Sequence, residues 1–424
     1  MNALAINGGP MTINPTEARY IWPRITQEMR GIAISQMEGS LSIYDRSGIF
    51  KEFEEKFANY HGMPYALLSN SGTSAISSMF EGIGLCPGDE VICPAYTFFA
   101  TVSPVMHTGA IPVLCDCDES GNIDPLEIER KITTRTKAVI VTHMWGIPCD
   151  MRTISNICKD KGVYLFEDCS HAHGASFAEQ KVGSFGDASA WSLQGQKIVT
   201  GGEGGIMLTR NRDIHIRALL QGHYNKRCKQ EIPKDHELYR YALTGLGLKF
   251  RAHPIAIAIA SHQFNQLDDW IAQKQQFVDE ITASLKRYPF LKMPSCENRQ
   301  ASWYALTMQF LPELANGVTI NQFEKALHAE GLIEVDHPGS TGPIHNLALF
   351  TNPERVLSRL YHKPIKQHGS FDQAIAFYEQ AIKMPVWAFA DERPIVEAYI
   401  RGLAKVCDAV MQRPDSINSI SVRK

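Results

Sequence analysis

Lys197 stands where a lysine could do covalent chemistry. Residues 191–205, WSLQGQKIVTGGEGG, place it after a short apolar run, with Glu203 as the acidic residue nearby. A lysine at the end of a buried strand is costly unless its charge is paired, solvated or removed by chemistry. Small neighbours and flexible glycines would give access to its amine, which could form an imine with an aldehyde. A solvated surface lysine is the alternative. The glycines are Gly201, Gly202, Gly204 and Gly205.

A turn of small residues, SNSGTSA at 69–75, could bind an anion. It opens a helical pattern, so the backbone N–H groups of Ser71, Gly72 and Thr73 would point at one place. An ordinary N-capped helix would have the same sequence. The turn therefore indicates an anion site only in combination with other groups.

Asp168 is the third group, and it ends the apolar strand of FEDCSHAHGA at 166–175. A carboxylate there can reach a ligand, although a cap or turn former is the common role of such an aspartate. His171 and His173 alternate onto one face of this stretch. We predict no metal site, because no third ligand is spaced to complete one.

Together these groups match the needs of pyridoxal 5′-phosphate (PLP). The cofactor requires a phosphate cradle, an amine for its aldehyde, and a carboxylate that keeps the pyridine nitrogen protonated. An aromatic side chain that stacks on the ring is also expected, and AYTFFA at 95–100 offers Phe98. The sequence therefore predicts PLP as the cofactor.

The elements that must position these residues form an α/β fold. Between 65 and 209, short apolar runs alternate with helical patterns, which is typical of a mainly parallel sheet flanked by helices. In such sheets ligands bind beyond the carboxyl ends of the strands. We expect strands at 65–70, near 94, and at 111–118, 137–144, 163–170, 187–193 and 204–209, and helices at 71–85 and 151–162.

The remaining chain predicts a smaller second domain. A helix pair is expected at 253–288, and the patterns at 303–310, 320–332, 371–382 and 394–411 favour an α+β unit. We therefore divide the chain into a large domain with an N-terminal arm (1–265), a small C-terminal domain (266–412) and a disordered tail (413–424).

Composition narrows the range of partners. The chain has 424 residues and a net charge of -3, with 42 basic and 45 acidic residues mixed along it, so we expect no nucleic-acid partner. No apolar run approaches the ~20 residues of a membrane span. The ten cysteines are irregularly spaced, and no basic residue precedes Arg19, which favours a cytoplasmic protein over a secreted one.

The joint pattern resembles the DegT/DnrJ/EryC1/StrS family of PLP-dependent sugar and cyclitol aminotransferases, which have the fold type I of aspartate aminotransferase. The resemblance runs through RSGIFKEFEEKFANYHG, SNSGTSAI, EDCSHAHGA, GSFGDASAWSLQGQK and TGGEGGIMLT. It implies that Lys197 is the Schiff-base lysine and that Asp168 holds the pyridine nitrogen. It further implies a phosphate-binding turn at Ser71, Gly72 and Thr73, a stacking role for Phe98, and a phosphate contact from Ser192.

Several positions depart from the usual family pattern. His171 stands where the family usually has a glutamine near the cofactor. With Gln194, SLQGQK differs from the common SFHxxK and looks more like branches that act on inosose-type cyclitols or make aminohydroxybenzoate. Lys249 replaces an asparagine that usually reaches the phosphate of the other subunit.

Two further residues are candidates for substrate binding. Arg251 could hold a substrate carboxylate or form a structural ion pair. The segment 336–350 resembles the family's HYPxPLHxQ stretch, which places His345 at the active site; a bystander histidine is the alternative.

The resemblance implies a homodimer with shared active sites and a transamination. L-Glutamate or L-glutamine would be the amino donor, and a ketone on a cyclitol, a ketosugar or a related secondary metabolite would be the acceptor. One alternative is a PLP- or PMP-dependent sugar dehydratase, although a histidine replaces the lysine in those enzymes. The other is a non-catalytic PLP-binding regulatory protein.

Overall fold

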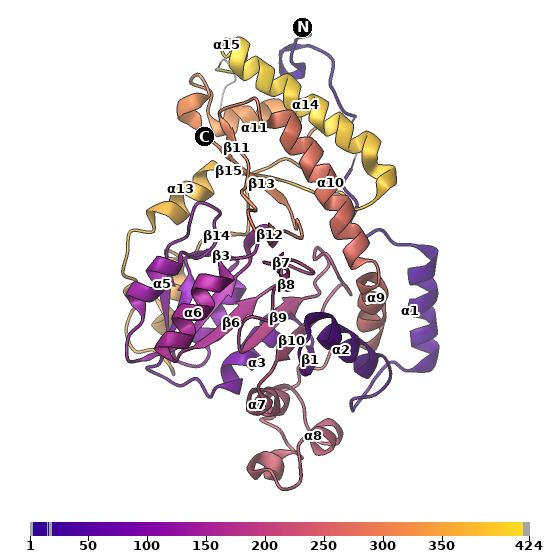
Figure 1. The fold of residues 1–424 in the computed structure, drawn as a ribbon, viewed down its shortest axis with the longest axis vertical. Coiled ribbons are helices and arrows are strands. Elements are labelled where there is room, and N and C mark those ends of the chain that lie inside the picture. The colour runs from indigo at the N-terminus through magenta and orange to yellow at the C-terminus, as the bar shows by residue number, and fades with distance from the viewer. Residues whose placement is uncertain (1–2, 15, 17–18, 419–424) are drawn as a thin grey trace.

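The computed structural model describes residues 3–14, 16 and 19–418. Figure 1 shows a larger lower part built around one sheet and a smaller upper part crossed by long helices. The helices are α1 (Gln27–Gly39), α2 (Gly48–His61), α3 (Gly72–Gly82), α4 (Ser103–Met106), α5 (Pro125–Lys131), α6 (Met151–Lys161), α7 (Arg212–Gly222), α8 (Lys226–Glu231), α9 (Pro254–Phe264), α10 (Leu267–Leu285), α11 (Ile320–Ala329), α12 (Ala348–Thr351), α13 (Asp372–Gln380), α14 (Arg393–Gln412) and α15 (Asp415–Asn418).

The central sheet has seven strands in the order β1-β10-β9-β6-β5-β2-β4. The strands are β1 (Tyr65–Ser69), β2 (Glu90–Pro94), β4 (Ile111–Cys115), β5 (Thr136–Thr142), β6 (Tyr164–Asp168), β9 (Ala188–Ser192) and β10 (Gly205–Thr209). Strand β10 runs antiparallel to both of its neighbours, and the other neighbouring pairs are parallel. The predicted mainly parallel sheet flanked by helices is confirmed, with strand limits close to those expected.

Burial explains why these segments are strands. Every residue of β2 and β10 is buried, as expected for strands covered on both faces by helices. The crossover helices also bury one face: α6 buries Met151, Ile154 and Cys158. Gly162 follows the helix with a φ of 66°, the left-handed conformation that is common after a helix. The carboxyl ends of β6 and β9 thus point to one edge of the sheet.

A second, antiparallel sheet has the order β11-β13-β15 and lies in the upper part of the molecule (Figure 1). The strands are β11 (Leu291–Lys292), β13 (Leu306–Phe310) and β15 (Ala381–Met384); two-residue strands also occur at β3 (Tyr96–Thr97), β7 (Ser176–Phe177), β8 (Gln180–Lys181), β12 (Arg299–Gln300) and β14 (Gly342–Pro343). Helices α10, α11 and α14 contribute buried residues to the same hydrophobic cluster as this sheet.

Packing crosses the predicted domain boundary at 265/266. Leu4 and Ile13 of the N-terminal arm pack with the cluster of the small sheet, whereas Ile344 and Phe377 pack with the cluster of the large sheet. Helix α10 belongs to both parts: its first half packs with the large domain through Leu267, Trp270 and Ile271, and its second half with the small domain through Phe277, Val278, Ile281 and Leu285. The boundary itself falls in the turn between α9 and α10.

The predicted disorder from 413 onward does not hold for its first residues. Helix α15 forms at Asp415–Asn418, and the side chain of Ile417 is fully buried in the cluster of the small domain. Burial of one large aliphatic side chain is enough to fix a short terminal segment. Residues 419–424 of the predicted tail lie outside the described residues.

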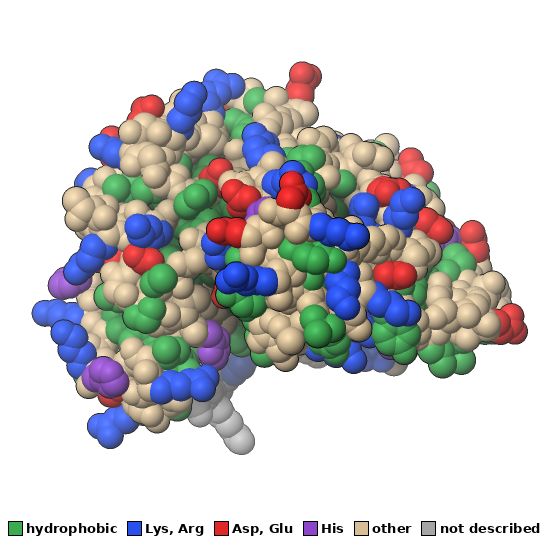
Figure 2. Space-filling view, turned by 90° about the horizontal axis from the view of Figure 1, so that it is seen from below, with side chains coloured by type: hydrophobic (Ala, Val, Ile, Leu, Met, Phe, Trp, Pro, Cys, Tyr) green, Lys and Arg blue, Asp and Glu red, His purple; other side chains and the backbone are tan. Residues whose placement is uncertain are grey.

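Surface charge and the state of the cysteines bear on the partners of the chain. On the face shown in Figure 2, basic and acidic side chains are interspersed with apolar ones. Within the described ranges, no helix has the length and apolar character needed to cross a bilayer. All ten cysteines lie in the described ranges and are unpaired, and eight of them are buried.

A buried ion pair joins α2, α8 and β1. The Glu54 carboxylate accepts hydrogen bonds from Arg227 Nη2 at 2.7 and 2.9 Å and from the backbone N–H of Leu68 at 2.9 Å. Arg46 adds a third contact at 3.0 Å. Because both Glu54 and Arg227 are buried, removal of either partner would leave a buried charge with one remaining counter-charge, which is Arg46 for Glu54 and Glu231 for Arg227.

We predict that Arg227→Met lowers the free energy of unfolding by about 3 kcal/mol, because it leaves the Glu54 carboxylate in the core with only the partly exposed Arg46 as a counter-charge. Urea unfolding followed by circular dichroism measures the loss. The control is Arg130→Met, which removes an exposed ion pair with Glu127 and should cost less than about 1 kcal/mol. Equal losses in the two variants would contradict the prediction.

Candidate functional site

A cavity of about 660 Å³ opens beyond the carboxyl ends of β6 and β9, between the two sheets. Most of the predicted site residues line it, although they come from four separate stretches of the chain. These are Ser71, Gly72, Thr73, Phe98, Asp168, His171, Ser192, Gln194 and Lys197. The small domain closes the other side with Tyr304, Glu334, Thr341 and Lys383.

Lys197 follows β9 and points its amine into this cavity. Its Nζ lies 4.7 Å from the centre of the Tyr304 ring, and its backbone carbonyl accepts a hydrogen bond from Trp22 Nε1 at 2.8 Å. Burial lowers the pKa of the amine to about 8, and the charge of Asp168 opposes that shift. A neutral, nucleophilic amine is therefore accessible near neutral pH.

Asp168 is held in place by two donors at the end of β6. Thr101 Oγ1 donates to Oδ2 at 2.7 Å, and the backbone N–H of Ser170 donates to Oδ1 at 3.0 Å. Thr101 in turn contacts the hydroxyls of Thr97 and Thr142 at 2.9 and 3.2 Å. This buried network fixes the orientation of the carboxylate before any ligand arrives.

The turn before α3 presents free backbone donors to the cavity. Ser71 caps the helix by accepting from the N–H of Ser74, while the N–H groups of Gly72 and Thr73 have no acceptor within the described chain. A Cβ at Gly72 would lie 2.7 Å from Cβ of Ser192, so only glycine allows the turn to approach β9 this closely. The arrangement suits an anion such as a phosphate.

His171 stacks on Tyr304, a residue that sequence reasoning missed. The ring centroids lie 4.0 Å apart with an interplanar angle of 10°. Burial holds the pKa of His171 well below its ordinary value, with the nearby Lys197 amine adding to the shift, so the imidazole is neutral. Its Nδ1 is buried and has no partner in the described part of the chain, which leaves it for a ligand.

A buried lysine bonds the backbone next to Tyr304. Lys274 of α10 is 1% exposed, and its Nζ donates to the carbonyl of Trp303 at 2.9 Å. Burial lowers the pKa of this amine to about 7. Trp303 itself has a φ of 55°, a conformation that is unusual for a residue other than glycine and needs such support.

Three predicted residues do not line the cavity of their own chain. Lys249 and Arg251 lie in the segment after α8, where the Arg251 guanidinium sits 5.0 Å from the centre of the Tyr44 ring. His345 was expected at the active site, but it stacks on Phe371 at 4.9 Å. The reason is local: β14 pairs with β3, and Ile344 donates to the carbonyl of Ala95, which carries the following residue past the cavity.

Possible metal ligands gather elsewhere, at His143, Glu167 and Cys169 beneath the sheet edge. Each Glu167 oxygen already accepts from backbone N–H groups of Gly183, Phe185 or Gly186 at 2.7 to 2.9 Å. His143 Nδ1 accepts from the N–H of Cys149, so its Nε2 carries the proton and donates to Glu167 at 3.2 Å. The group is satisfied as a structural hydrogen-bond network.

The comparisons agree with this geometry. The sequence model of the DegT/DnrJ/EryC1/StrS aminotransferase family matches residues 36–393. The chain belongs to this family. It is a PLP-dependent aminotransferase, and PLP is its cofactor.

Individual relatives extend over most of the chain. A protein of Micromonospora echinospora described as a putative L-glutamine:3-amino-2,3-dideoxy-scyllo-inosose aminotransferase is 29% identical over 402 residues, which cover 90% of this chain and 93% of the relative. GDP-perosamine synthase of Escherichia coli O157:H7 is 34% identical over 247 residues, or 58% of this chain and 65% of that one. The crystal structure of an aminotransferase from Psychrobacter cryohalolentis shares the fold, with a TM-score of 0.81 at 24% identity over 93% of this chain and all of that one.

We predict that, in the cofactor-free protein, acetylation of Lys197 rises with pH through a midpoint near pH 8, since only the neutral amine reacts. Surface lysines should have midpoints near pH ~10.4. Peptide mapping by mass spectrometry after timed acetylation gives the profile of each lysine. In Asp168→Asn the midpoint for Lys197 should fall further, because the carboxylate charge favours the ammonium form. A wild-type midpoint like that of surface lysines would refute the desolvation argument.

Proposed function

We propose that the enzyme moves an amino group from L-glutamine or L-glutamate to a ketone on a cyclitol, a ketosugar or a related secondary metabolite. One observation carries the proposal: the Lys197 amine, with its lowered pKa, shares a cavity with the Asp168 carboxylate and the free N–H groups of Gly72 and Thr73. A base, an anion site and a fixed carboxylate are the protein groups that PLP-dependent transamination requires.

The residues present fit PLP. The N–H groups at the start of α3, with Ser71 and Ser192 beside them, would hold the phosphate. Asp168 would hold the pyridine nitrogen protonated, and Lys197 would carry the cofactor between turnovers. The cofactor supplies the aldehyde that exchanges amino groups and a ring that withdraws electrons. Phe98 and His171 line the same space and would flank that ring.

Lys197 is placed to move the proton of the reaction. With PLP bound, the cofactor would supply the electron-withdrawing ring, and the free amine of Lys197 would take the proton from Cα of the amino donor and deliver it to the cofactor. Its pKa of about 8 suits both steps, because the amine can be neutral or charged near neutral pH. Asp168, fixed by Thr101 and Ser170, keeps its charge directed at one point throughout.

The acceptor side of the cavity favours a neutral, hydroxyl-rich ketone. Beside the charged Glu203, Glu334 and Lys383, the cavity is lined by uncharged polar side chains, so hydroxyl groups would find both donors and acceptors. These are Gln194, Gln196, Ser340 and Thr341. The full-length similarity to a putative L-glutamine-dependent inosose aminotransferase supports a cyclitol and this donor. The partial similarity to GDP-perosamine synthase keeps ketosugars within the proposal.

We predict that L-glutamine or L-glutamate bleaches the yellow absorbance of the PLP-loaded enzyme and that a keto acceptor restores it. Lys197→Ala should lower turnover by on the order of a thousandfold, because it removes both the cofactor tether and the base. The matched control is Lys56→Ala, a lysine whose pKa burial also lowers but which bonds the Ser261 carbonyl away from the cavity. A yellow protein whose band ignores every amino donor would contradict the proposal.

We further propose a homodimer whose active sites are shared. Large apolar side chains are more than two-fifths exposed on two neighbouring stretches, which is typical of an interface. Tyr44 joins the stretches, since its ring contacts both Lys226 and Arg251. A second copy seated there could bring Lys249, an exposed cation, to the phosphate of its partner. The apolar residues are Ile25, Ile34, Met37, Leu41, Tyr44, Tyr241, Leu243, Leu246 and Leu248.

Light scattering should give twice the 47.4 kDa of one chain. We predict that Lys249→Ala, like Lys197→Ala, is impaired alone, and that mixing the two variants after subunit exchange restores about a quarter of wild-type activity. Each mixed dimer would hold one site with both lysines. No recovery on mixing would refute shared sites, and a monomer in solution would refute the dimer.

The same proposal places the enzyme in the cytoplasm. Its ten cysteines, all within the described ranges, are unpaired and mostly buried. Free thiols persist in a reducing compartment, whereas secreted proteins commonly oxidise them.

A further inference from the structure

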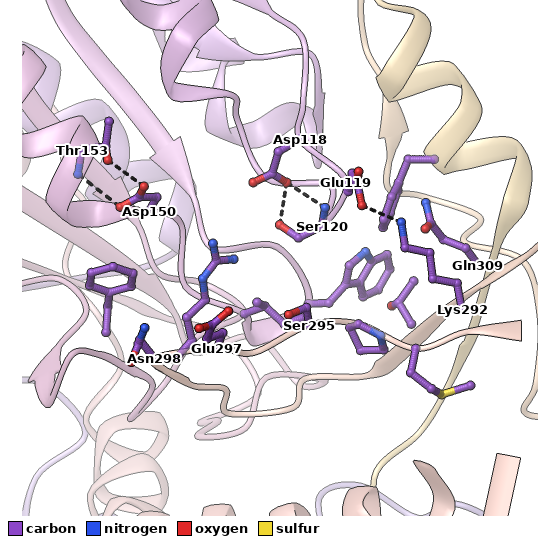
Figure 3. Close-up of a pocket in the computed structure, with 18 of the residues that line it drawn as sticks. Asp118, Glu119, Ser120, Asp150, Thr153, Lys292, Ser295, Glu297, Asn298 and Gln309 are labelled. Carbon is purple, nitrogen blue, oxygen red and sulfur yellow. Dashed lines mark hydrogen bonds and ion pairs between the residues drawn. The ribbon is translucent and has the colours of Figure 1, made fainter. Parts of the chain in front are cut away.

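A second cavity, of about 630 Å³, lies on the far side of Trp145 from Lys197. It opens between the loop that follows β4 and the stretch 292–299 of the small domain, as Figure 3 shows. An ion pair joins the two sides, with Lys292 Nζ 2.7 Å from Glu119 Oε2. Trp145 lines both cavities and therefore forms the wall between them.

The interior of this cavity holds polar groups that the protein leaves unused. Thr307 of β13 is 5% exposed, and its Oγ1 has no hydrogen-bond partner among the residues described. A buried hydroxyl without a partner is costly, so one that lines a cavity points to a ligand. Gln309 lies two residues further along the same strand, on the same face, and adds an amide to the lining.

The opposite wall offers a carboxylate oxygen. Asp118 accepts three bonds at Oδ1, from Ser120 N, Ser120 Oγ and Asn122 N at 2.8, 2.6 and 3.2 Å. Its Oδ2 has no such partner within the described chain, and Figure 3 shows the two bonds from Ser120 meeting on one oxygen. Burial raises the pKa of Asp118, while the bonds from Ser120 and the charge of Arg299 oppose the shift.

The charges of the lining largely cancel. The lining holds four carboxylates and three cations: Asp118, Glu119, Asp150 and Glu297 against Arg152, Lys292 and Arg299. Lys292 pairs directly with Glu119 at 2.7 Å. A ligand with a large net charge would gain no excess of opposite charge here. Trp145 and Phe377 add flat apolar surface, which suits the C–H face of a saturated ring.

We propose that this second cavity binds a neutral polyhydroxylated ring, either a cyclitol or a hexopyranose. The hydroxyl of Thr307, the amide of Gln309 and the free oxygen of Asp118 would bond its hydroxyl groups, and Trp145 would pack against its ring. Such a mixture of apolar surface and a few convergent polar groups, in a space of this size, is typical of small-molecule sites. The site is separate from the one that carries out transamination.

A ligand in the second cavity would affect the cavity that contains Lys197. The Trp145 carbonyl accepts from the N–H of Tyr304 at 3.0 Å, and the Gly146 carbonyl accepts from Ser302 at 2.9 Å. Tyr304 is the ring that stacks on His171 beside Lys197. A ligand that presses on Trp145 therefore acts on a segment tied directly to the catalytic cavity.

Isothermal titration of the PLP-loaded enzyme with myo-inositol and D-glucose tests the proposal, with the acyclic D-sorbitol as a comparison. We expect saturable binding of at least one ring polyol, with a dissociation constant below about 10 mM. Thr307→Val should weaken it by roughly fivefold to tenfold without lowering the melting temperature, because the lost hydroxyl bonds no protein group. Gln309→Leu, at a half-buried position, provides a second variant with the same expected loss.

The matched control is Thr341→Val, which makes the same change at an equally buried threonine that lines the Lys197 cavity. Loss of binding in Thr341→Val with none in Thr307→Val or Gln309→Leu would overturn the proposal, since the polyol would then occupy the active site. Absence of saturable binding, or equal affinity for D-sorbitol, would also overturn it. None of these outcomes depends on turnover, so they leave the proposed transamination to its own test.

Discussion

The removal of Lys197 from water is the constraint on which the functional site depends. The amine lies at the end of a buried strand, under the ring of Tyr304 and near a single carboxylate, and this burial brings its pKa to about 8. A surface lysine would be charged and unreactive at the same pH. The site therefore needs both domains, because the large domain supplies the lysine and the carboxylate, and the small domain supplies the ring that covers them.

Much of the large domain and the centre of the site could be predicted from local sequence. Apolar runs of five to seven residues, separated by helical patterns, fixed the strands, and in a parallel sheet the strand ends must meet at one edge. Asp168 ends β6, the turn at Gly72 follows β1, and Lys197 lies in the loop after β9, so their convergence followed from topology. The structure places them around one cavity, while their individual chemical roles remain predictions.

Other parts of the site depend on contacts that local patterns do not encode. Trp22 bonds the carbonyl of Lys197 across 175 positions of sequence. The position of Tyr304 depends on Lys274, which bonds the preceding carbonyl, and on the Trp145 carbonyl, which accepts from the Tyr304 N–H. Thr101, which orients Asp168, lies in a short 3₁₀ helix (Phe99–Thr101) that the sequence pattern did not predict. His345 does not line the cavity of its own chain, because the motif-like segment is held by its pairing with the chain near Ala95. The short helix at Asp415–Asn418 depends on long-range contacts, which are the burial of Ile417 and the hydrogen bond from Asn7 Nδ2 to the Ser416 carbonyl.

Helix α10 has a mechanical consequence for how substrates enter. Its 19 residues form a strut about 28 Å long, with one end embedded in each hydrophobic core. The two domains cannot separate unless α10 bends or its side chains leave one of the two cores. Either event would cost packing energy. A bulky acceptor would then enter through small displacements of loops at the rim of the cavity, such as the stretch around Ser340. A large opening between the two domains would not be needed.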